Sequence, residues 1–252
     1  IVNQVCGSGI RSIASGFQSI KAGDSKIVIA GGQESMSLAP HAIHLRDGKK
    51  LGNTEITDTM IKDGLWDAFH GYHMGVTAEN VATKFQVTRD DQDKFSLQSQ
   101  EKALKAQKEN KFKEEIINFK VNSKKTEIDF NNDEHPRPDI TLEALKRLKP
   151  VFKKDGTVTA GNASGINDGA AAVILMTEEE AKKRKLNKLV SIKSWASCGV
   201  DPALMGTGPI PASKKALDLA KWSIKDVDLF EVNEAFAAQS IAVIRTLSIP
   251  EE

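Results

Sequence analysis

The sequence predicts an α/β fold in which parallel strands alternate with helices. Residues 26–31 and residues 169–176 are short, continuous apolar runs, a pattern typical of strands that are covered on both faces. Between residues 10 and 20 apolar side chains recur at helical spacing, and Gly23 then supplies a stop. A strand ending near Val5, this helix and the strand at residues 26–31 would together form a βαβ unit.

Length, composition and charge limit the classes of protein to which the chain can belong. Its 252 residues, 40% of them hydrophobic, can bury one large core or two small ones. A net charge of +1 gives no global attraction to nucleic acid or to a membrane surface. No apolar run approaches the roughly 18 residues that span a bilayer. We therefore expect neither a nucleic-acid partner nor a membrane-bound protein.

The two cysteines, Cys6 and Cys198, lie far apart and in unlike surroundings. They form no disulfide framework and no metal-binding cluster, and they suit a reducing cytoplasm. The chain begins inside a predicted strand and ends soon after a predicted helix. We therefore expect a fragment whose natural start and end are both missing.

Residues 37–159 differ in composition and pattern from the segments around them, because polar residues and short amphipathic helices replace the buried-strand pattern. This change predicts an excursion inserted between two core strands. Residues 88–91 form a capping box that opens a charged helix running to about Asn110, and we interpret its charges as a solvated face. Residues 115–121 and 126–130 predict a β-hairpin or two exposed strands.

The core pattern resumes with the strand at residues 169–176, whose small side chains permit tight packing under a helix. Residues 178–185 predict a charged helix and a linker. Strands are then predicted at residues 190–196 and 228–232, and helices at residues 212–221 and 234–247. The order strand, helix, strand, helix again indicates a parallel sheet.

The stretch Val2-Asn3-Gln4-Val5-Cys6-Gly7-Ser8-Gly9 places a cysteine where the first predicted strand turns into a helix. Free N–H groups and the positive end of the helix dipole stabilise a thiolate at such a position, and a thiolate is a usable nucleophile. Gly7 and Gly9 let a substrate come close to the sulfur. The alternative is a buried structural cysteine beside a glycine turn.

This stretch, with Ala30-Gly31-Gly32-Gln33-Glu34-Ser35-Met36-Ser37, resembles the nucleophile segment of the thiolases, enzymes that make or cleave 3-ketoacyl-coenzyme A. The resemblance continues in order along the whole chain. It implies a layered αβαβα fold with parallel-rich sheets, here incomplete, plus an inserted loop domain. Residues 1–36 and 165–187 would belong to the N-terminal core, residues 37–164 to the loop domain on the coenzyme A (CoA) side, and residues 188–252 to the C-terminal core.

The resemblance implies two catalytic residues in this chain, Cys6 and Asn233. Cys6 would take the acyl group. Asn233, in Asn233-Glu234-Ala235-Phe236-Ala237, would position a water that polarises the thioester carbonyl, where negative charge builds and preorganised donors stabilise it. Ala235 and Phe236 would line the pocket beside the pantetheine or acyl group. Without the family, an Asn at a strand-to-helix junction is ordinarily an N-cap.

Gly71-Tyr72-His73-Met74-Gly75 resembles the loop that short-chain, biosynthetic thiolases place over the reacting thioester. The resemblance implies that His73 lies close to the thioester and that Met74 closes the acyl pocket. This favours acetyl-CoA and acetoacetyl-CoA as substrates. Without the family, His73 would be an ordinary surface residue and Met74 a filler of space.

The CoA contacts implied by the resemblance lie between residues 134 and 169. Arg137 would meet the adenine and phosphate end, a task that suits a guanidinium by charge and by stacking. The remaining implied contacts are Phe152, Ala160, Ser164 and Gly165, the last three inside the characteristic run at residues 159–169. Ala144 departs from the pattern, because many relatives carry a serine there toward the adenine.

Two residues imitate family motifs without matching them. His135 lacks the glycine pattern that follows the catalytic His of the family, and Cys198 is outside the glycine-rich segment that holds the second catalytic Cys. We expect both of those residues to lie beyond residue 252, and we expect the fragment itself to be inactive.

The activity that the resemblance implies is the reversible Claisen condensation of two acetyl-CoA molecules to acetoacetyl-CoA, through an acyl-enzyme on Cys6. It implies no metal and no bound cofactor, only CoA thioesters as substrates, and a cytoplasmic homotetramer built as a dimer of dimers. The alternatives are a degradative thiolase for longer 3-ketoacyl chains, a ketoacyl synthase, and a protein that binds acyl-CoA without turnover.

Overall fold

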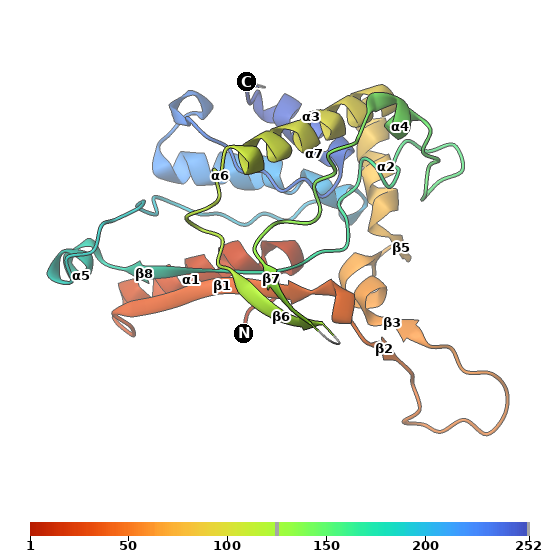
Figure 1. The fold of residues 1–252 in the computed structure, drawn as a ribbon, viewed down its shortest axis with the longest axis horizontal. Coiled ribbons are helices and arrows are strands. Elements are labelled where there is room, and N and C mark those ends of the chain that lie inside the picture. The colour runs from red at the N-terminus through yellow and green to blue at the C-terminus, as the bar shows by residue number, and fades with distance from the viewer. Residues whose placement is uncertain (124–125, 251–252) are drawn as a thin grey trace. The chain divides into compact units, whose positions relative to one another are not determined.

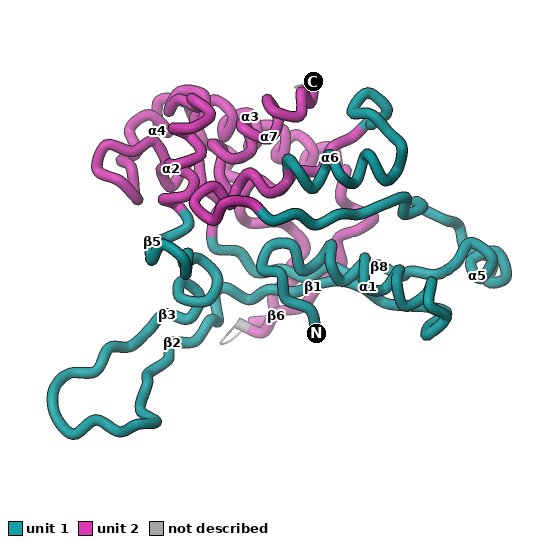
Figure 2. The backbone as a smooth tube through the Cα atoms, turned by 180° about the vertical axis from the view of Figure 1, so that it is seen from behind, with its two compact units in different colours: residues 1–74, 166–199, 210–228 teal, residues 75–165, 200–209, 229–252 magenta. Residues whose placement is uncertain are grey.

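A computed structural model describes residues 1–123 and 126–250 (Figure 1). The chain divides into two compact units, each built from several segments (Figure 2). Unit 1 comprises residues 1–74, 166–199 and 210–228, and unit 2 comprises residues 75–165, 200–209 and 229–252. The predicted division into two cores and an inserted loop domain rests on the family resemblance and stays a prediction.

Unit 1 is centred on one helix and one two-stranded sheet. Its helices and helical turns are η1 (Val5–Gly7), α1 (Ser8–Ala22), η2 (Met36–Leu38), η3 (Met60–Leu65), α5 (Glu178–Lys183), most of α6 (Pro209–Ala220) and η5 (Ile224–Asp226). Its strands are β1 (Ile27–Ser35), β2 (His41–Ala42), β3 (Thr57–Asp58), β4 (Trp66–Asp67), β5 (Tyr72–His73) and β8 (Asp168–Met176).

The strands β1 and β8 were both predicted, but their direction was predicted wrongly. They pair antiparallel from Ile27 opposite Met176 to Ser35 opposite Asp168. All strand pairs within the described residues are antiparallel, and residues 1–4 form no strand, so the expected βαβ unit is not formed. An apolar run indicates a strand, but it does not specify the neighbour or the direction of that neighbour.

Helix α1 covers one face of this sheet, as the ribbon shows (Figure 1). The approach is close at Gly16, where a Cβ would lie 2.9 Å from Leu175 Cδ1 and 3.0 Å from Val28 Cγ1. Ile29 and Ile174, on the other face, are 74% and 65% exposed within the described chain. Within the described chain α1 thus covers one face of this sheet and the other face is open, and the covering of both faces stays a prediction.

Unit 2 is mainly helical. Its elements are α2 (Met74–Lys84, whose first residue falls in unit 1), α3 (Arg89–Lys108), β6 (Phe119–Ser123), β7 (Thr126–Phe130), α4 (Leu142–Lys146), η4 (Pro202–Thr207) and α7 (Ala237–Leu247). Strands β6 and β7 pair antiparallel with Phe119 opposite Phe130, which confirms the predicted hairpin. The capping box at Thr88 and Asp91 is also confirmed.

The core of unit 2 lies where α2, α3 and α7 pack together. Ala82, Val87, Ala238 and Ile241 are buried there. Gln92 and Asp93 on α3 are also completely buried, so the prediction that the charges of this helix form a solvated face is wrong at Asp93. Partners from distant segments bind them, and a helical pattern does not reveal such partners.

Three other predicted elements differ from the structure. Residues 190–196 and 228–232 form no strand among the described residues, because a strand exists only where a neighbour pairs with it. Helix α7 begins at Ala237 and not at residue 234, since Phe236 is extended (φ −145°, ψ 141°) and bridges to Ala163.

No helix in the described part of the chain has both the length and the apolar character needed to cross a bilayer.

Candidate active site

Cys6 lies in the turn η1, which leads directly into α1 at Ser8. The thiol is free and exposed, so the alternative of a buried structural cysteine does not hold within unit 1. The expected position at the start of a helix is confirmed. The segment before the turn is not the expected strand, because residues 1–4 pair with no strand among the described residues.

Short-range hydrogen bonds fix the turn around Cys6. The Ser8 hydroxyl donates to the Val5 carbonyl (2.7 Å) and accepts from the Gln4 N–H (2.9 Å). The Val5 N–H donates to Asn3 Oδ1 (2.8 Å). Val5 has a φ of 51°, a left-handed conformation that is costly for a β-branched residue. The turn thus holds Cys6 through contacts within a few residues.

His73 is the last residue of a small hairpin in unit 1, and Met74 follows it. Trp66 pairs with His73, and Asp67 pairs with Tyr72, across strands β4 and β5. His70, in the turn, has its Nδ1 2.7 Å from Asp67 Oδ2, and its ring stacks on Tyr72. The hairpin that presents His73 is therefore closed by a polar contact between neighbours.

Burial influences the pKa values of His73 and Asp67 in this hairpin in opposite ways. It lowers the pKa of His73, because the charged imidazolium is poorly solvated there. Burial also tends to raise the pKa of Asp67, but hydrogen bonds from His70 and from the Phe69 N–H outweigh it and leave that pKa below its usual value. His73 is thus held mainly as a neutral imidazole, and Asp67 as a carboxylate.

In unit 2, the loop at residues 157–164 is joined to the segment that precedes α7. Ser164 donates to the Ala235 carbonyl with both its N–H (3.1 Å) and its hydroxyl (3.0 Å). The Ala237 N–H donates to the Asn162 carbonyl (3.0 Å), and Ala163 bridges antiparallel to Phe236. Ser164, Ala235 and Phe236 are thus brought together by the backbone itself.

The Phe152 ring packs edge-to-face against the Phe236 ring, with centroids 6.4 Å apart. The same ring lies over Gly75, where a Cβ would come within 2.3 Å of it, so only glycine fits without movement. Phe152 is therefore fixed between α2 and the segment before α7.

The other predicted residues of unit 2 are more open. Ala160, Arg137 and Asn233 are exposed, and the amide of Asn233 makes no hydrogen bond among the described residues of the unit. The Arg137 backbone is tied to α3 by a bond from its N–H to Gln100 Oε1 (2.8 Å). Gly165 packs against His135, where a Cβ would lie 2.5 Å from the ring.

Two family models match the chain, the thiolase N-terminal domain over residues 1–179 and the thiolase C-terminal domain over residues 186–252. The chain belongs to the thiolase family. It is 58% identical over 246 residues to an acetyl-CoA acetyltransferase of Rhizobium meliloti, covering 98% of this chain and 63% of the relative. The chain thus spans less than two thirds of the length of that curated thiolase.

Solved thiolase structures agree with the fold. The Bacillus anthracis acetyl-CoA acetyltransferase aligns with a TM-score of 0.96 at 45% identity, covering 100% of this chain and 64% of the other. Human mitochondrial 3-ketoacyl-CoA thiolase in complex with CoA aligns with a TM-score of 0.94 at 44% identity, covering 99% and 62%. The predicted thiolase-like α/β fold is confirmed.

The thiolase site residues predicted from sequence are distributed over both units. Cys6, His73 and Met74 belong to unit 1. The members in unit 2 are Arg137, Phe152, Ala160, Ser164, Gly165, Asn233, Ala235 and Phe236. Within the described residues, no group of three or more His, Cys, Asp or Glu side chains is arranged to hold a metal ion.

Sequence analysis missed the polar residues that hold the thiolase loop at residues 157–164 in place. Glu79, Asp93 and Asn162 are 4%, 0% and 2% exposed, and each binds this loop or lies within it. The available signal was the run at residues 159–169, which was used only for the family resemblance. The charge pattern of α3 gave no sign that Asp93 points inward.

Proposed function

We propose that the protein is an acetyl-CoA C-acetyltransferase, which condenses two acetyl-CoA molecules to acetoacetyl-CoA and can run in reverse. The observation that carries the proposal is the free, exposed thiol of Cys6 directly before α1 in a thiolase chain. The names of the relatives, acetyl-CoA acetyltransferase at 58% identity among them, support the same activity.

The first half of the proposed reaction forms a thioester on Cys6. The Cys6 thiolate attacks the acetyl carbonyl carbon of acetyl-CoA, the new S–C bond forms, and the bond to the CoA sulfur breaks. CoA leaves as its thiolate and takes a proton. Negative charge passes through the carbonyl oxygen in the tetrahedral intermediate, and a water positioned by Asn233 would donate to that oxygen.

The second half forms the carbon–carbon bond. A base removes a proton from the methyl group of a second acetyl-CoA, and the resulting carbanion attacks the acyl carbonyl on Cys6. The S–C bond then breaks, which releases acetoacetyl-CoA and regenerates the Cys6 thiolate. The family resemblance assigns the base to a cysteine in a glycine-rich segment that this chain does not include, and the proposal needs neither a metal nor a redox cofactor.

The carrier part of the substrate is proposed to bind in unit 2. Phe152, Ala235 and Phe236 offer an apolar wall beside pantetheine, supported by the packing of the Phe152 and Phe236 rings. Ala160, Ser164 and Gly165 would contact pantetheine and adenine, and Arg137 would meet the phosphates. CoA bound to a structurally similar thiolase makes this ligand class the natural one to test.

His73 and Met74 are proposed to set the chain length. A neutral His73 next to the thioester, with Met74 closing the acyl pocket, favours acetyl and acetoacetyl groups over longer ones. The second candidate function is thiolysis of longer 3-ketoacyl-CoA, favoured by the likeness to 3-ketoacyl-CoA thiolase. Comparing kcat/KM for thiolysis of acetoacetyl-CoA with that of a 3-ketodecanoyl-CoA decides between them.

Labelling with radioactive acetyl-CoA, followed by peptide mapping, tests the catalytic role of Cys6. We expect label on the peptide that contains Cys6, none after Cys6→Ala, and an unchanged amount after Cys198→Ala, the matched control. A protein that binds acyl-CoA without turnover would leave Cys6 unlabelled in the wild type. Label on Cys198 would also contradict the proposal.

The assembly and the location remain proposals as well. The family resemblance supports a homotetramer, and the two free thiols suit a reducing cytoplasm. Light scattering of the purified protein tests the first, and imaging of a tagged protein in its own cells tests the second.

A further inference from the structure

Two buried carboxylates on different helices hold the loop at residues 157–164. Glu79 on α2 accepts from the N–H groups of Thr157 (2.8 Å) and Val158 (2.8 Å) and from the Thr157 hydroxyl (3.0 Å). Asp93 on α3 accepts from Asn162 Nδ2 (3.1 Å). The start of the loop is therefore fixed to α2, and its middle is fixed to α3.

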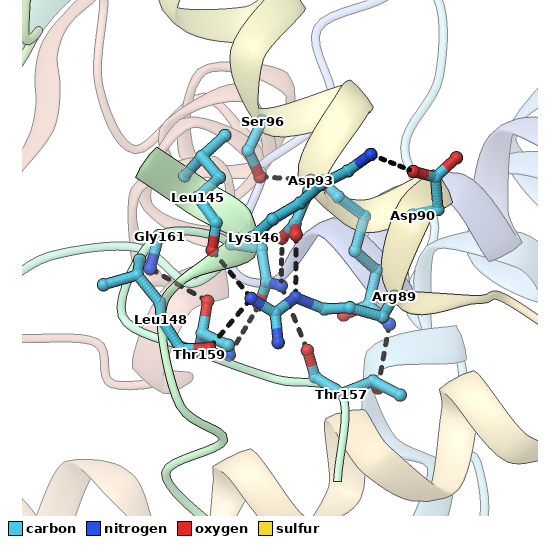
Figure 3. Close-up of polar contacts among 12 residues, drawn as sticks. Arg89, Asp90, Asp93, Ser96, Leu145, Lys146, Leu148, Thr157, Thr159 and Gly161 are labelled. Carbon is cyan, nitrogen blue, oxygen red and sulfur yellow. Dashed lines mark hydrogen bonds and ion pairs between the residues drawn. The ribbon is translucent and has the colours of Figure 1, made fainter. Parts of the chain in front are cut away.

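Arg89 gives Asp93 its fixed orientation. Its Nε donates to Asp93 Oδ2 (2.8 Å), and one terminal nitrogen donates to the carbonyls of Leu145 (2.7 Å) and Leu148 (3.0 Å). Figure 3 shows the Arg89 guanidinium directed at all three partners. Since Asp93 is fully buried, these bonds replace the solvation that its charge has lost.

The side chain of Asn162 uses all its hydrogen-bonding groups but one lone pair. Its Nδ2 donates to Asp93 Oδ1 (3.1 Å) and to the Thr157 carbonyl (3.1 Å), while its Oδ1 accepts from the Thr159 N–H (2.8 Å). Its main-chain carbonyl accepts from the Ala237 N–H (3.0 Å). One residue thus connects α3, its own loop and the first residue of α7.

We propose that Asp93 and Asn162 are positioning residues for the acyl-CoA site, because their buried hydrogen bond fixes both the loop that carries Ala160 and Ser164 and the segment from Ala235 to Ala237. Neither side chain needs to touch the substrate. The expected effect on catalysis rests on the proposed function. The connection from α3 to Ala237 depends only on the hydrogen bonds that Asn162 forms with Asp93 and Ala237.

Asp93→Asn breaks the link with the smallest change in shape. Asparagine has one acceptor oxygen in place of two, so its NH2 group must face either the Arg89 Nε–H or the Asn162 NH2 group, donor against donor. Asp90→Asn is the matched control, since Asp90 lies on the same helix but is half exposed and forms ion pairs with Lys94 (2.6 Å) and Lys146 (3.2 Å). Figure 3 shows both carboxylates.

Steady-state kinetics of acetoacetyl-CoA thiolysis by the full-length protein gives the first readout. We expect Asp93→Asn to raise KM for acetoacetyl-CoA about tenfold with kcat within about twofold, and Asp90→Asn to change neither by more than about 1.5-fold. A purely structural role for Asp93 would lower kcat through a smaller folded fraction and leave KM unchanged, and that result would overturn the proposal.

Amide hydrogen exchange gives the second readout, which does not depend on activity. We expect Asp93→Asn to speed exchange at Thr159 and Ala237, which bind Asn162, and to leave Ala181 in α5 unchanged. Unchanged exchange at Ala237 would overturn the link. If the full-length wild type turns over no substrate, the proposed function fails, and calorimetric Kd values for CoA replace KM in the same comparison.

If Asp93→Asn does not fold, Arg89→Lys provides a second test of the same contacts. Lysine retains the charge but cannot bind Asp93 and both carbonyls at once. We expect a KM rise of about threefold and faster exchange at Ala237. No change in either measurement would overturn the proposal.

Discussion

The segment around Cys6 and the loop at residues 157–164 are held in opposite ways. Around Cys6 the side-chain hydrogen bonds among the described residues join positions at most four apart, and all of these residues except Ser8 are exposed. The loop is held by buried carboxylates that lie 69 to 79 positions away in the chain. The proposed nucleophile is thus set by its own turn, whereas the proposed substrate loop is set by the packing of unit 2.

Because the two regions are held by different kinds of contact, substitutions in them should affect reactivity and stability to different degrees. Changes near Cys6 should alter chemistry with little effect on the free energy of unfolding. Changes beneath the loop should alter both the free energy of unfolding and substrate binding.

The largest expected effect is that of Glu79→Ala. It removes the acceptor for the Thr157 and Val158 N–H groups and leaves buried donors unpaired, so we expect the free energy of unfolding to fall by about 2–4 kcal/mol. Urea denaturation followed by circular dichroism measures it. Glu101→Ala, an exposed glutamate on α3, is the control and should stay within about 0.5 kcal/mol. Equal effects of the two variants would contradict the contrast.

Sequence analysis succeeded where the determining contacts are local. The position of Cys6 before a helix, the capping box at Thr88 and the hairpin of β6 and β7 all follow from residues close together in the chain. It failed where distant residues decide, as for the inward direction of Asp93, which depends on Asn162 far along the chain.

The strand predictions failed for a related reason. The apolar runs at β1 and β8 were recognised, but their antiparallel pairing joins segments that are far apart in the chain, and no pattern within either run encodes it. At the start of α7 the Phe236 bridge to Ala163 shortened the predicted helix. The candidate site residues were therefore proposed from the family resemblance, whereas the contacts that support them became visible only in the structure.

The next largest effect is expected for Gly161→Ala, with Gly9→Ala as the comparison. At Gly161 a Cβ would lie 2.4 Å from Leu145 Cδ2 and 2.6 Å from Leu148 Cδ1, so Gly161→Ala should cost about 1–3 kcal/mol of unfolding free energy. Gly9 in α1 has no atom within 4 Å of its Cβ position, and Gly9→Ala should stabilise the helix by up to about 1 kcal/mol.

The two glycine variants should also differ in activity. Gly9→Ala adds a methyl group close to the Cys6 turn, so we expect slower acetyl transfer in a protein that is at least as stable as the wild type. Thermal denaturation and initial rates measure both quantities. A destabilised Gly9→Ala variant would show that the segment near Cys6 is packed as tightly as the loop.

A smaller effect is expected at Val5, whose φ of 51° is unfavourable for a β-branched side chain. Val5→Asn should raise the free energy of unfolding by about 0.5–1 kcal/mol, because asparagine adopts this conformation more readily and Val5 is 51% exposed. Val2→Asn, an exposed valine without positive φ, should give no gain. Urea midpoints at constant m-value measure both, and a loss of stability in Val5→Asn would show that the Val5 side chain packs usefully.

The smallest expected effect concerns pH at the hairpin of β4 and β5. Burial lowers the pKa of His73 below the usual 6.5, so the unfolded chain takes up a proton more readily than the folded one as pH falls below that value. The free energy of unfolding should therefore decrease slightly as pH falls from the usual histidine range toward the lowered pKa, and it should level off below it. His73→Gln should remove this part of the pH dependence.

Asp67 contributes in a different pH window. Its pKa lies below the usual 3.8, so its stabilisation is present above that value and is lost as pH falls through the lowered pKa. Because the windows of His73 and Asp67 do not overlap, a shallow decrease in the usual histidine range does not come from the Asp67 carboxyl. NMR titration of the His73 ring protons checks the assignment. A midpoint at or above 6.5 would mean that solvent reaches His73 freely, and that the hairpin holds it as loosely as the turn holds Cys6.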